Sequence, residues 1–200
     1  MADSQYGFAF DLNRDVRTVE AMAAHLKPYI YEDELYGPMP GDLPKLTIGG
    51  LLMRLSRLSA LTNLLSLPQQ ETLKTAQNQF DAMRKEWAVA YEGKIRRELK
   101  VRMSALDQFF NECADNLRGC ADEYPSTVEK RVMIEHLQDE AFALNSAPAG
   151  LKNGLTALDN KNRRYFEPGK FIWDSRLELA YPPQKYWFLY GRPSKKPPQT

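Results

Sequence analysis

The chain has 200 residues, of which 43% are hydrophobic and 26% are charged, and its formal net charge is +1. This composition is typical of a folded globular protein rather than a disordered one, and a chain of this length can bury a core without metal ions or disulfides. The charge is unevenly placed, because residues 161–200 hold nine Lys and Arg against three acids, whereas residues 1–160 hold eighteen against twenty-three.

The sequence predicts a soluble, cytoplasmic protein with no membrane contact. Its most apolar segment, from Ile48 to Leu65, is interrupted by Arg54 and Arg57, which argues against a membrane span. The N-terminus carries Asp3 and no basic segment before an apolar one, so we expect no secretory signal.

The first part of the chain predicts an arm, a helix and a loop. Residues 1–13 carry three aromatic side chains at a spacing of two, which suits a short strand or an extended arm laid on a helical groove. A helix should begin near Asn13 and be kinked or ended by Pro28. A short turn from Tyr29 to Tyr36 should follow, and then a loop rich in Gly and Pro over residues 37–44.

Two helix-start patterns follow this loop. Thr47 can cap a helix that runs to about Leu67. Ser66 with Gln69 forms a capping-box pattern, with Pro68 near the first turn, and so predicts the start of the next helix.

That next helix should be unusually long, extending over residues 69–118. From Gln69 to Tyr124 the apolar residues recur at steps of three or four, which places them on one helical face. At 1.5 Å per residue the helix would be about 75 Å long, and we expect Gly93 to bend it rather than break it. The stripe comprises Leu73, Ala76, Phe80, Met83, Trp87, Tyr91, Ile95, Leu99, Met103, Leu106, Phe110, Cys113, Leu117 and Cys120.

The two cysteines, Cys113 and Cys120, lie on this apolar stripe. Two helical turns would hold them about 10 Å apart, beyond the reach of a disulfide. We therefore expect buried, reduced thiols that pack as small apolar side chains.

Three further elements complete the predicted chain. Residues from Gly119 to Pro125 should close the long helix, and Ser126 with Glu129 should cap a helix that runs to about Asn145. Another helix should follow Pro148, and residues 195–200 should be disordered.

The predicted fold class is all-α: an elongated bundle of about five or six helices around one long central helix. Its expected domains are a helical bundle over residues 1–160 and a basic, aromatic, irregular C-terminal segment over residues 161–200, packed on the bundle. Because so long a helix exceeds what its own chain can cover, a homodimer is expected.

The sequence contains no pattern for a metal or cofactor site. Neither His25 nor His136 follows a Glu at the spacing of a di-iron bundle, and there is no Cys-x-x-Cys, so we expect no metal and no cofactor. Gly49 and Gly50 lie at a predicted helix start but lack a phosphate-loop pattern. We expect these glycines to permit the close approach of another helix.

One fragment suggests catalysis. Arg131 and His136 lie five residues apart on a predicted helix, and this spacing resembles the Arg-x4–6-His motif of the HEPN helical-bundle ribonucleases. The resemblance covers six residues, and Val132 stands where the family usually has a polar residue. It implies cleavage of RNA by a dimer, in which His136 would transfer protons and Arg131 would neutralise phosphate charge.

The basic, aromatic C-terminal segment is the best candidate for a binding surface. Nine of the 26 residues from Tyr165 to Tyr190 are aromatic, and cations stand between them. Such residues seal one end of a helical bundle, contact a protein partner or bind single-stranded nucleic acid by stacking. The candidate binding residues are Arg163, Arg164, Lys170, Trp173, Lys185, Tyr186, Trp187 and Arg192.

Three functions are compatible with these patterns. The leading hypothesis is a non-enzymatic helical interaction or adaptor protein. The second is a nucleic-acid-associated helical protein, including a HEPN-like ribonuclease that uses Arg131 and His136. The third is a small-molecule-binding bundle with a pocket among Trp87, Phe80 and the C-terminal aromatic residues.

Overall fold

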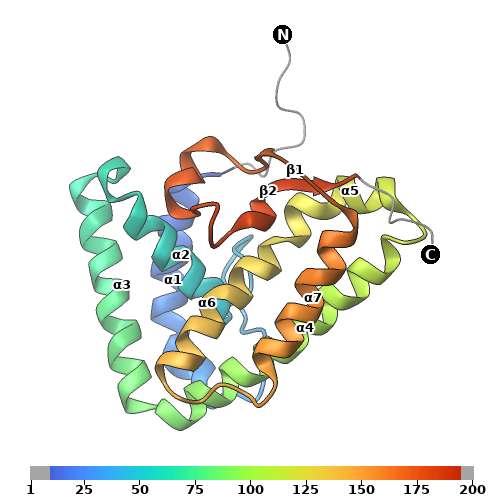
Figure 1. The fold of residues 1–200 in the computed structure, drawn as a ribbon. Coiled ribbons are helices and arrows are strands. Elements are labelled where there is room, and N and C mark those ends of the chain that lie inside the picture. The colour runs from blue at the N-terminus through green and yellow to red at the C-terminus, as the bar shows by residue number, and fades with distance from the viewer. Residues whose placement is uncertain (1–9, 195–200) are drawn as a thin grey trace. The chain divides into compact units, whose positions relative to one another are not determined.

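Helices form most of the computed structural model, which describes residues 10–194 (Figure 1). The predicted all-α class is therefore confirmed. Contacts divide the chain into two units: residues 11–99 and 135–147 form the N-terminal unit, and residues 100–134 and 148–194 join Phe10 in the C-terminal unit. The division falls inside α4 (Ala88–Glu112) and α6 (Glu129–Ala143), so both helices contribute residues to both units.

The N-terminal unit is built on α1 (Leu12–Tyr31), which packs against α3 (Leu67–Glu86) and α2 (Ile48–Ala60). A short 3-10 helix, η1 (Thr62–Leu64), joins α2 to α3. The face of α1 that carries Val19, Met22 and Leu26 is buried. Because α1 continues through Pro28 to Tyr31, the separate turn expected from Tyr29 to Tyr36 is wrong.

Side-chain caps explain where these helices begin. The Thr47 hydroxyl accepts a hydrogen bond of 3.0 Å from the backbone N–H of Gly50 at the start of α2. Ser66 and Gln69 form the capping box of α3, which has Pro68 in its first turn. Both predicted helix starts are confirmed, because each depends only on residues within one turn.

The single long helix predicted over residues 69–118 is wrong. The chain leaves helical geometry at Trp87, where φ is −121° and ψ is 36°, and α4 begins at the next residue. Figure 1 shows the chain changing direction between α3 and α4. The Trp87 ring contacts the Tyr31 ring edge to face at 4.4 Å, a long-range contact that no local pattern announces. Gly93, as expected, does not interrupt α4.

The apolar stripe is nevertheless core in α3, α4 and α5 (Leu117–Thr127) alike, because most of its members are buried within this one chain. Trp87, Met103 and Leu117 are half-buried. The homodimer was expected because one chain could not cover a helix of about 75 Å, and without that helix the expectation loses its premise.

Buried polar groups fix the start of α2 against α4. The Glu98 side chain is fully buried and accepts a 3.0 Å hydrogen bond from the N–H of Gly49. A Cβ atom on Gly49 would lie 2.7 Å from a Glu98 carboxylate oxygen and 2.9 Å from Leu137 of α6. The expected close helix approach at Gly49 is confirmed, and the anion at this helix start is supplied by the protein itself.

A buried ion cluster joins α1 to α2. The Asp15 carboxylate accepts hydrogen bonds from Nε and Nη2 of Arg57, and Nε of Arg54 lies 3.5 Å from it. Arg54 also donates to the Gly50 carbonyl at 2.9 Å. All three charged side chains are buried, so this cluster fixes the relative positions of the two helices.

The C-terminal unit contains α5, α7 (Leu151–Tyr165) and a two-stranded antiparallel sheet of β1 (Phe166–Phe171) and β2 (Tyr190–Pro193). The expected helix end between Gly119 and Pro125 is wrong, because α5 begins with Asn116 as its cap and runs through both residues. Ser126 belongs to α5, so it does not cap α6.

The C-terminal segment is more regular than predicted. Two 3-10 helices, η2 (Ser175–Ala180) and η3 (Trp187–Leu189), connect β1 to β2. Gly191 has φ +139°, and a Cβ there would overlap the Glu167 carbonyl, so only glycine suits this close pairing of the strands. The domain boundary expected after residue 160 lies inside α7, and as a domain division it stays a prediction.

Two expectations fall outside the residues that the structure describes. They are the aromatic arm before Phe10 and the disordered end after residue 194. Within residues 10–194, no helix is both long enough and apolar enough to cross a bilayer.

Candidate functional site in the C-terminal segment

The aromatic side chains of the C-terminal segment form a continuous cluster of edge-to-face and tilted contacts. Trp173 and Tyr186, two of the predicted binding residues, are 5% and 4% exposed and both contact the ring of Tyr181. Trp187 is half-buried and contacts Phe166 at 5.1 Å. The predicted binding aromatics are therefore mainly core, as expected for rings that seal one end of a bundle.

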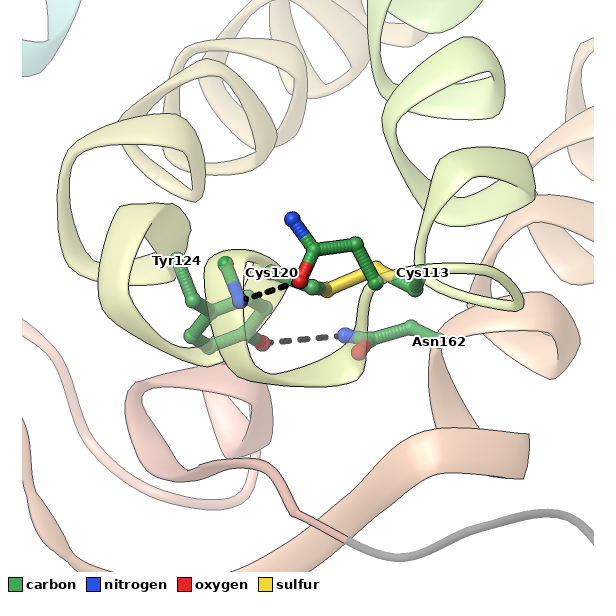
Figure 2. Close-up of a disulfide and its surroundings, with 6 residues drawn as sticks. Cys113, Cys120, Tyr124 and Asn162 are labelled. Atoms are coloured by element: carbon green, nitrogen blue, oxygen red, sulfur yellow. Dashed lines mark hydrogen bonds between the residues drawn. A yellow bond between two sulfur atoms is a disulfide. The ribbon is translucent and has the colours of Figure 1, made fainter.

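Helix α5 holds this cluster through buried hydrogen bonds. The indole N–H of Trp173 donates to the Pro125 carbonyl at 2.7 Å, and the phenol of Tyr124 donates to the Phe188 carbonyl at 2.8 Å. Asn162 of α7 donates to the same phenol oxygen at 3.0 Å (Figure 2). Burial raises the pKa of Tyr124 above its ordinary value, so the phenol remains a neutral donor at physiological pH.

A disulfide joins the end of α4 to the first turn of α5. Cys113 and Cys120 are bonded, with their Cα atoms 5.3 Å apart (Figure 2). The expectation of two separated thiols is wrong because α4 ends at Glu112, and residues 113–116 turn the chain back before α5 begins. Cys120 lies one helical turn before Tyr124, so the disulfide and the aromatic anchor share one helix.

One sequence signal could have revealed this turn. Asp115 and Asn116 stand together between the cysteines, and Asn is a preferred N-cap. The Asn116 side chain accepts a 3.0 Å hydrogen bond from the N–H of Gly119. The three-and-four spacing of the apolar residues continued across this break and concealed it.

Four cations of the segment are exposed, whereas most of its rings are buried. Arg163, Arg164, Lys170 and Arg192 are exposed, and none of them forms an ion pair with another of the residues that the structure describes. We call these four residues the basic surface. They lie at the C-terminal end of α7 and on the strands β1 and β2. The guanidinium of Arg163 covers the Trp187 ring at 3.7 Å from its centroid.

Two other cations of the segment are paired with acids, and a third lies near a ring. Lys161 pairs with Asp107 at 2.5 Å, and Arg176 pairs with Asp174 at 2.7 Å. Lys185, also a predicted binding residue, lies 5.7 Å from the ring of its neighbour Tyr186. Lys161 and Arg176 are thus paired with acids, whereas the four residues of the basic surface form no ion pair with another described residue.

The Arg131 side chain of the HEPN-like fragment is bound within the C-terminal unit. Its guanidinium donates two hydrogen bonds to the Asp159 carboxylate, at 2.9 and 3.0 Å, and lies 4.8 Å from the centroid of the Phe188 ring. Arg131 is 6% exposed, whereas His136 is half-buried and belongs to the N-terminal unit. A buried guanidinium in a two-bond ion pair connects α6 to α7 and presents no donor pair to an external phosphate.

Two residues of the suggested small-molecule pocket lie in the N-terminal unit. Phe80 is buried and contacts the Tyr91 ring at 5.8 Å. Trp87 lines a hollow of about 270 Å³ between α1 and α3, together with Leu26 and Met83. Within the described residues, no group of three or more His, Cys, Asp or Glu is arranged to hold a metal ion.

The C-terminal segment thus combines four exposed cations with a cluster of mostly buried rings, which is hydrogen-bonded to α5, the helix that the disulfide joins to α4. Comparison with known proteins adds no further guide, since no family model, no curated protein and no solved structure matches this chain.

Proposed function

We propose that this chain is a non-enzymatic interaction protein that binds an acidic segment of a protein partner through the basic surface. The observation that carries the proposal is that Arg163, Arg164, Lys170 and Arg192 are exposed and form no ion pair among residues 10–194. Residues 161–194 hold seven Lys and Arg against three acids, so the local charge favours a negatively charged partner. Arginine suits carboxylates because its planar guanidinium forms two parallel hydrogen bonds to them.

The positions of the rings favour an acidic protein segment, rather than single-stranded nucleic acid, as the binding partner. Proteins that bind single strands stack successive bases on exposed aromatic faces. Here Trp173 and Tyr186 are buried against other rings, and Arg163 already covers a face of Trp187. The four cations are therefore exposed to a partner, whereas Trp173 and Tyr186 are not, and one face of the half-buried Trp187 is already covered.

The other hypotheses receive less support. The engagement of Arg131 by Asp159 disfavours a ribonuclease that uses Arg131 and His136. The homodimer is not part of the proposal, because the helix that required it is absent. The cytoplasmic location stays a prediction, and the disulfide weakens it, since disulfides persist mainly in oxidising compartments.

Fluorescence anisotropy with two labelled probes of equal charge tests the proposal. One probe is a Glu-rich peptide of about fifteen residues, and the other is single-stranded RNA with the same number of negative charges. We expect the peptide to bind more tightly than the RNA, and its affinity to fall as NaCl is raised, because exposed charges are screened.

A pair of matched variants locates the binding surface. The first variant carries Arg163→Gln, Arg164→Gln, Lys170→Gln and Arg192→Gln. The second removes the same charge from four exposed cations of the N-terminal unit: Arg17→Gln, Lys45→Gln, Lys74→Gln and Lys85→Gln. We expect the first to weaken peptide binding at least about fourfold, since each exposed pair contributes about 0.2–1 kcal/mol, and the second to weaken it much less.

Two outcomes would contradict the proposal. Equal weakening by both variants would mean that only net charge attracts the peptide. Tighter binding of the RNA than of the peptide would favour the nucleic-acid hypothesis.

A further inference from the structure

Two different sets of contacts hold the two helices that the disulfide joins. The last turns of α4 are held to α7 without the disulfide, because the Lys161 ammonium contacts both Asp107 and Asn111, at 2.5 and 3.1 Å. The C-terminal half of α5 is held by Tyr124 and Pro125, through their hydrogen bonds to the C-terminal segment and Asn162. The first turn of α5, Leu117–Cys120, depends on the Asn116 cap and the disulfide.

A helix as short as α5 has little stability of its own. It contains 11 residues, and isolated helices below about 12–15 residues are marginal in water. It also includes Gly119 and Pro125, two of the weakest helix formers. The covalent link at Cys120 therefore holds the first turn of α5, whereas the buried hydrogen bonds at Tyr124 and Pro125 hold its C-terminal half.

The disulfide closes a short loop, so its influence is local. The two cysteines are seven residues apart, and they are the only cysteines of the chain. A chain of 200 residues has enough apolar core to stay folded without such a link. Breaking the S–S bond is thus expected to release the first turn of α5 while the rest of the chain remains folded.

Helix α5 transmits this change to the C-terminal segment. It contacts β2, which carries Arg192 of the basic surface. Its Pro125 carbonyl accepts the Trp173 indole hydrogen bond, and its Tyr124 phenol donates to Phe188, next to Trp187. A looser α5 would therefore loosen the strand that carries Arg192 and the rings next to Trp187, which Arg163 covers.

We propose that Cys113 and Cys120 form a reversible redox switch that controls the basic surface. Its effect on affinity rests on the proposed function, whereas its effect on α5 does not. In the oxidised form α5 is fixed and the basic surface is preorganised for its partner. In the reduced form the first turn of α5 frays, and the partner must supply the ordering free energy on binding.

The reductant is a dithiol, either a protein dithiol or a small one. A thiolate of the dithiol attacks one sulfur, which breaks the Cys113–Cys120 bond and forms a mixed disulfide. The second thiol then displaces the protein, so that the dithiol becomes a disulfide and the chain gains two electrons and two protons. The turn between the cysteines, residues 114–116, is exposed, whereas both cysteines are buried, so attack requires this turn to open.

The test compares the oxidised and reduced forms of the full chain. Thiol titration in redox buffers of dithiothreitol gives the fraction oxidised. Hydrogen exchange of the Trp173 indole N–H, assigned by its loss in Trp173→Phe, reports the hydrogen bond between α5 and the C-terminal segment, and anisotropy with the Glu-rich peptide reports affinity. We expect reduction to accelerate the indole exchange and to weaken peptide binding about fivefold or more.

A variant without cysteines provides the control. Cys113→Ala with Cys120→Ala should behave like the reduced chain and should not respond to dithiothreitol. If that variant does not fold, reduction of the natural chain still gives both readouts. Two free thiols at every buffer ratio, or identical indole exchange and affinity in both forms, would overturn the switch.

The two proposals fail in different ways. If the oxidised chain does not bind the peptide, the proposed function fails, and the indole exchange still decides whether the disulfide controls α5. If the peptide binds equally in both forms while the exchange differs, the redox control of the basic surface is refuted and the proposed function stands.

Discussion

Asn162 of α7 donates a buried hydrogen bond of 3.0 Å to the phenol oxygen of Tyr124 on α5, and that phenol in turn donates to the Phe188 carbonyl. This two-step chain connects α7, α5 and the C-terminal segment at a point from which water is excluded. Removing one partner of such a buried hydrogen bond costs more free energy than the bond contributes. The group that remains is buried with neither its partner nor water to bind.

Tyr124→Phe should therefore destabilise the protein by about 1–3 kcal/mol. The substitution keeps the ring and removes only the hydroxyl, which leaves the Asn162 amide and the Phe188 carbonyl without this partner. Urea denaturation measures the change. Tyr36→Phe, at a ring that is 44% exposed, should change stability by less than about 0.5 kcal/mol. Equal effects of both variants would show that the Tyr124 hydroxyl contributes nothing specific.

Stability should also fall at alkaline pH, and Tyr124 should contribute to the fall. Burial raises its pKa above the ordinary value of 10.0, so above pH 10 the folded chain keeps a proton that the unfolded chain has lost. The contribution is complete below pH 10 and is lost at about 1.4 kcal/mol per pH unit above it. Burial lowers the pKa of Lys94, so this group makes stability rise with pH. Its contribution is the same in the natural chain and in Tyr124→Phe, and it cancels in their comparison. Urea denaturation between about pH 9.5 and 11 gives the free energy of unfolding at each pH. That free energy should fall less steeply with pH in Tyr124→Phe than in the natural chain, by an amount that corresponds to about one proton.

Removal of the disulfide should lower stability by roughly 2–3 kcal/mol, because the link closes a small loop in the unfolded chain. Cys113→Ala with Cys120→Ala, measured in urea without reductant, should match the natural chain measured with reductant. The far-ultraviolet circular dichroism should stay largely helical in both. A loss of most helix in either sample would contradict the local role assigned to the bond.

Asp15→Asn should be among the most destabilising single changes, at about 3–5 kcal/mol. It removes the carboxylate charge that the buried guanidinium groups of Arg54 and Arg57 share. The control is Asp42→Asn, because Asp42 pairs with Arg14 at 3.1 Å but its side chain is 85% exposed. That change should cost at most about 1 kcal/mol. Thermal and urea denaturation of both variants give the comparison.

Two glycines inside helices should respond to alanine with opposite signs. Gly49→Ala forces a Cβ to within 2.7 Å of the buried Glu98 carboxylate and should destabilise the protein. Gly93→Ala meets nothing within 4 Å in the middle of α4 and should stabilise it by about 0.5–1 kcal/mol. The two melting temperatures should therefore move apart, and a shift of both in the same direction would contradict the packing at α2.

Local sequence signals were sufficient for some elements and insufficient for others. Thr47 and the Ser66–Gln69 pair predicted their helix starts correctly, because a cap is an interaction within one turn. The apolar stripe predicted which side chains are buried, since spacing reports the face of a helix. It could not report that the helix ends at Trp87, because the residues there are ordinary helix formers and the Tyr31 contact comes from elsewhere in the chain.

The candidate site was predictable in composition and not in arrangement. Alternating cations and aromatic residues are compatible with a binding surface and with a sealed core. Only the fold shows which of these side chains are buried and which are exposed. It buries Trp173 and Tyr186 and leaves Arg163 and Arg192 exposed. The disulfide was missed because its formation depends on the turn at residues 113–116, and the three-and-four spacing of the apolar residues continues across that turn without a gap.

The backbone at Gly191 places the β1–β2 pairing under a constraint of handedness. Every chiral residue of natural proteins would direct its first side-chain carbon at the Glu167 carbonyl from this φ of +139°. Size, polarity and charge are therefore irrelevant to which substitutions position 191 tolerates, and even alanine should be excluded. Saturation mutagenesis of β2 should find only glycine at position 191. The neighbouring Arg192 should accept most replacements without loss of folding.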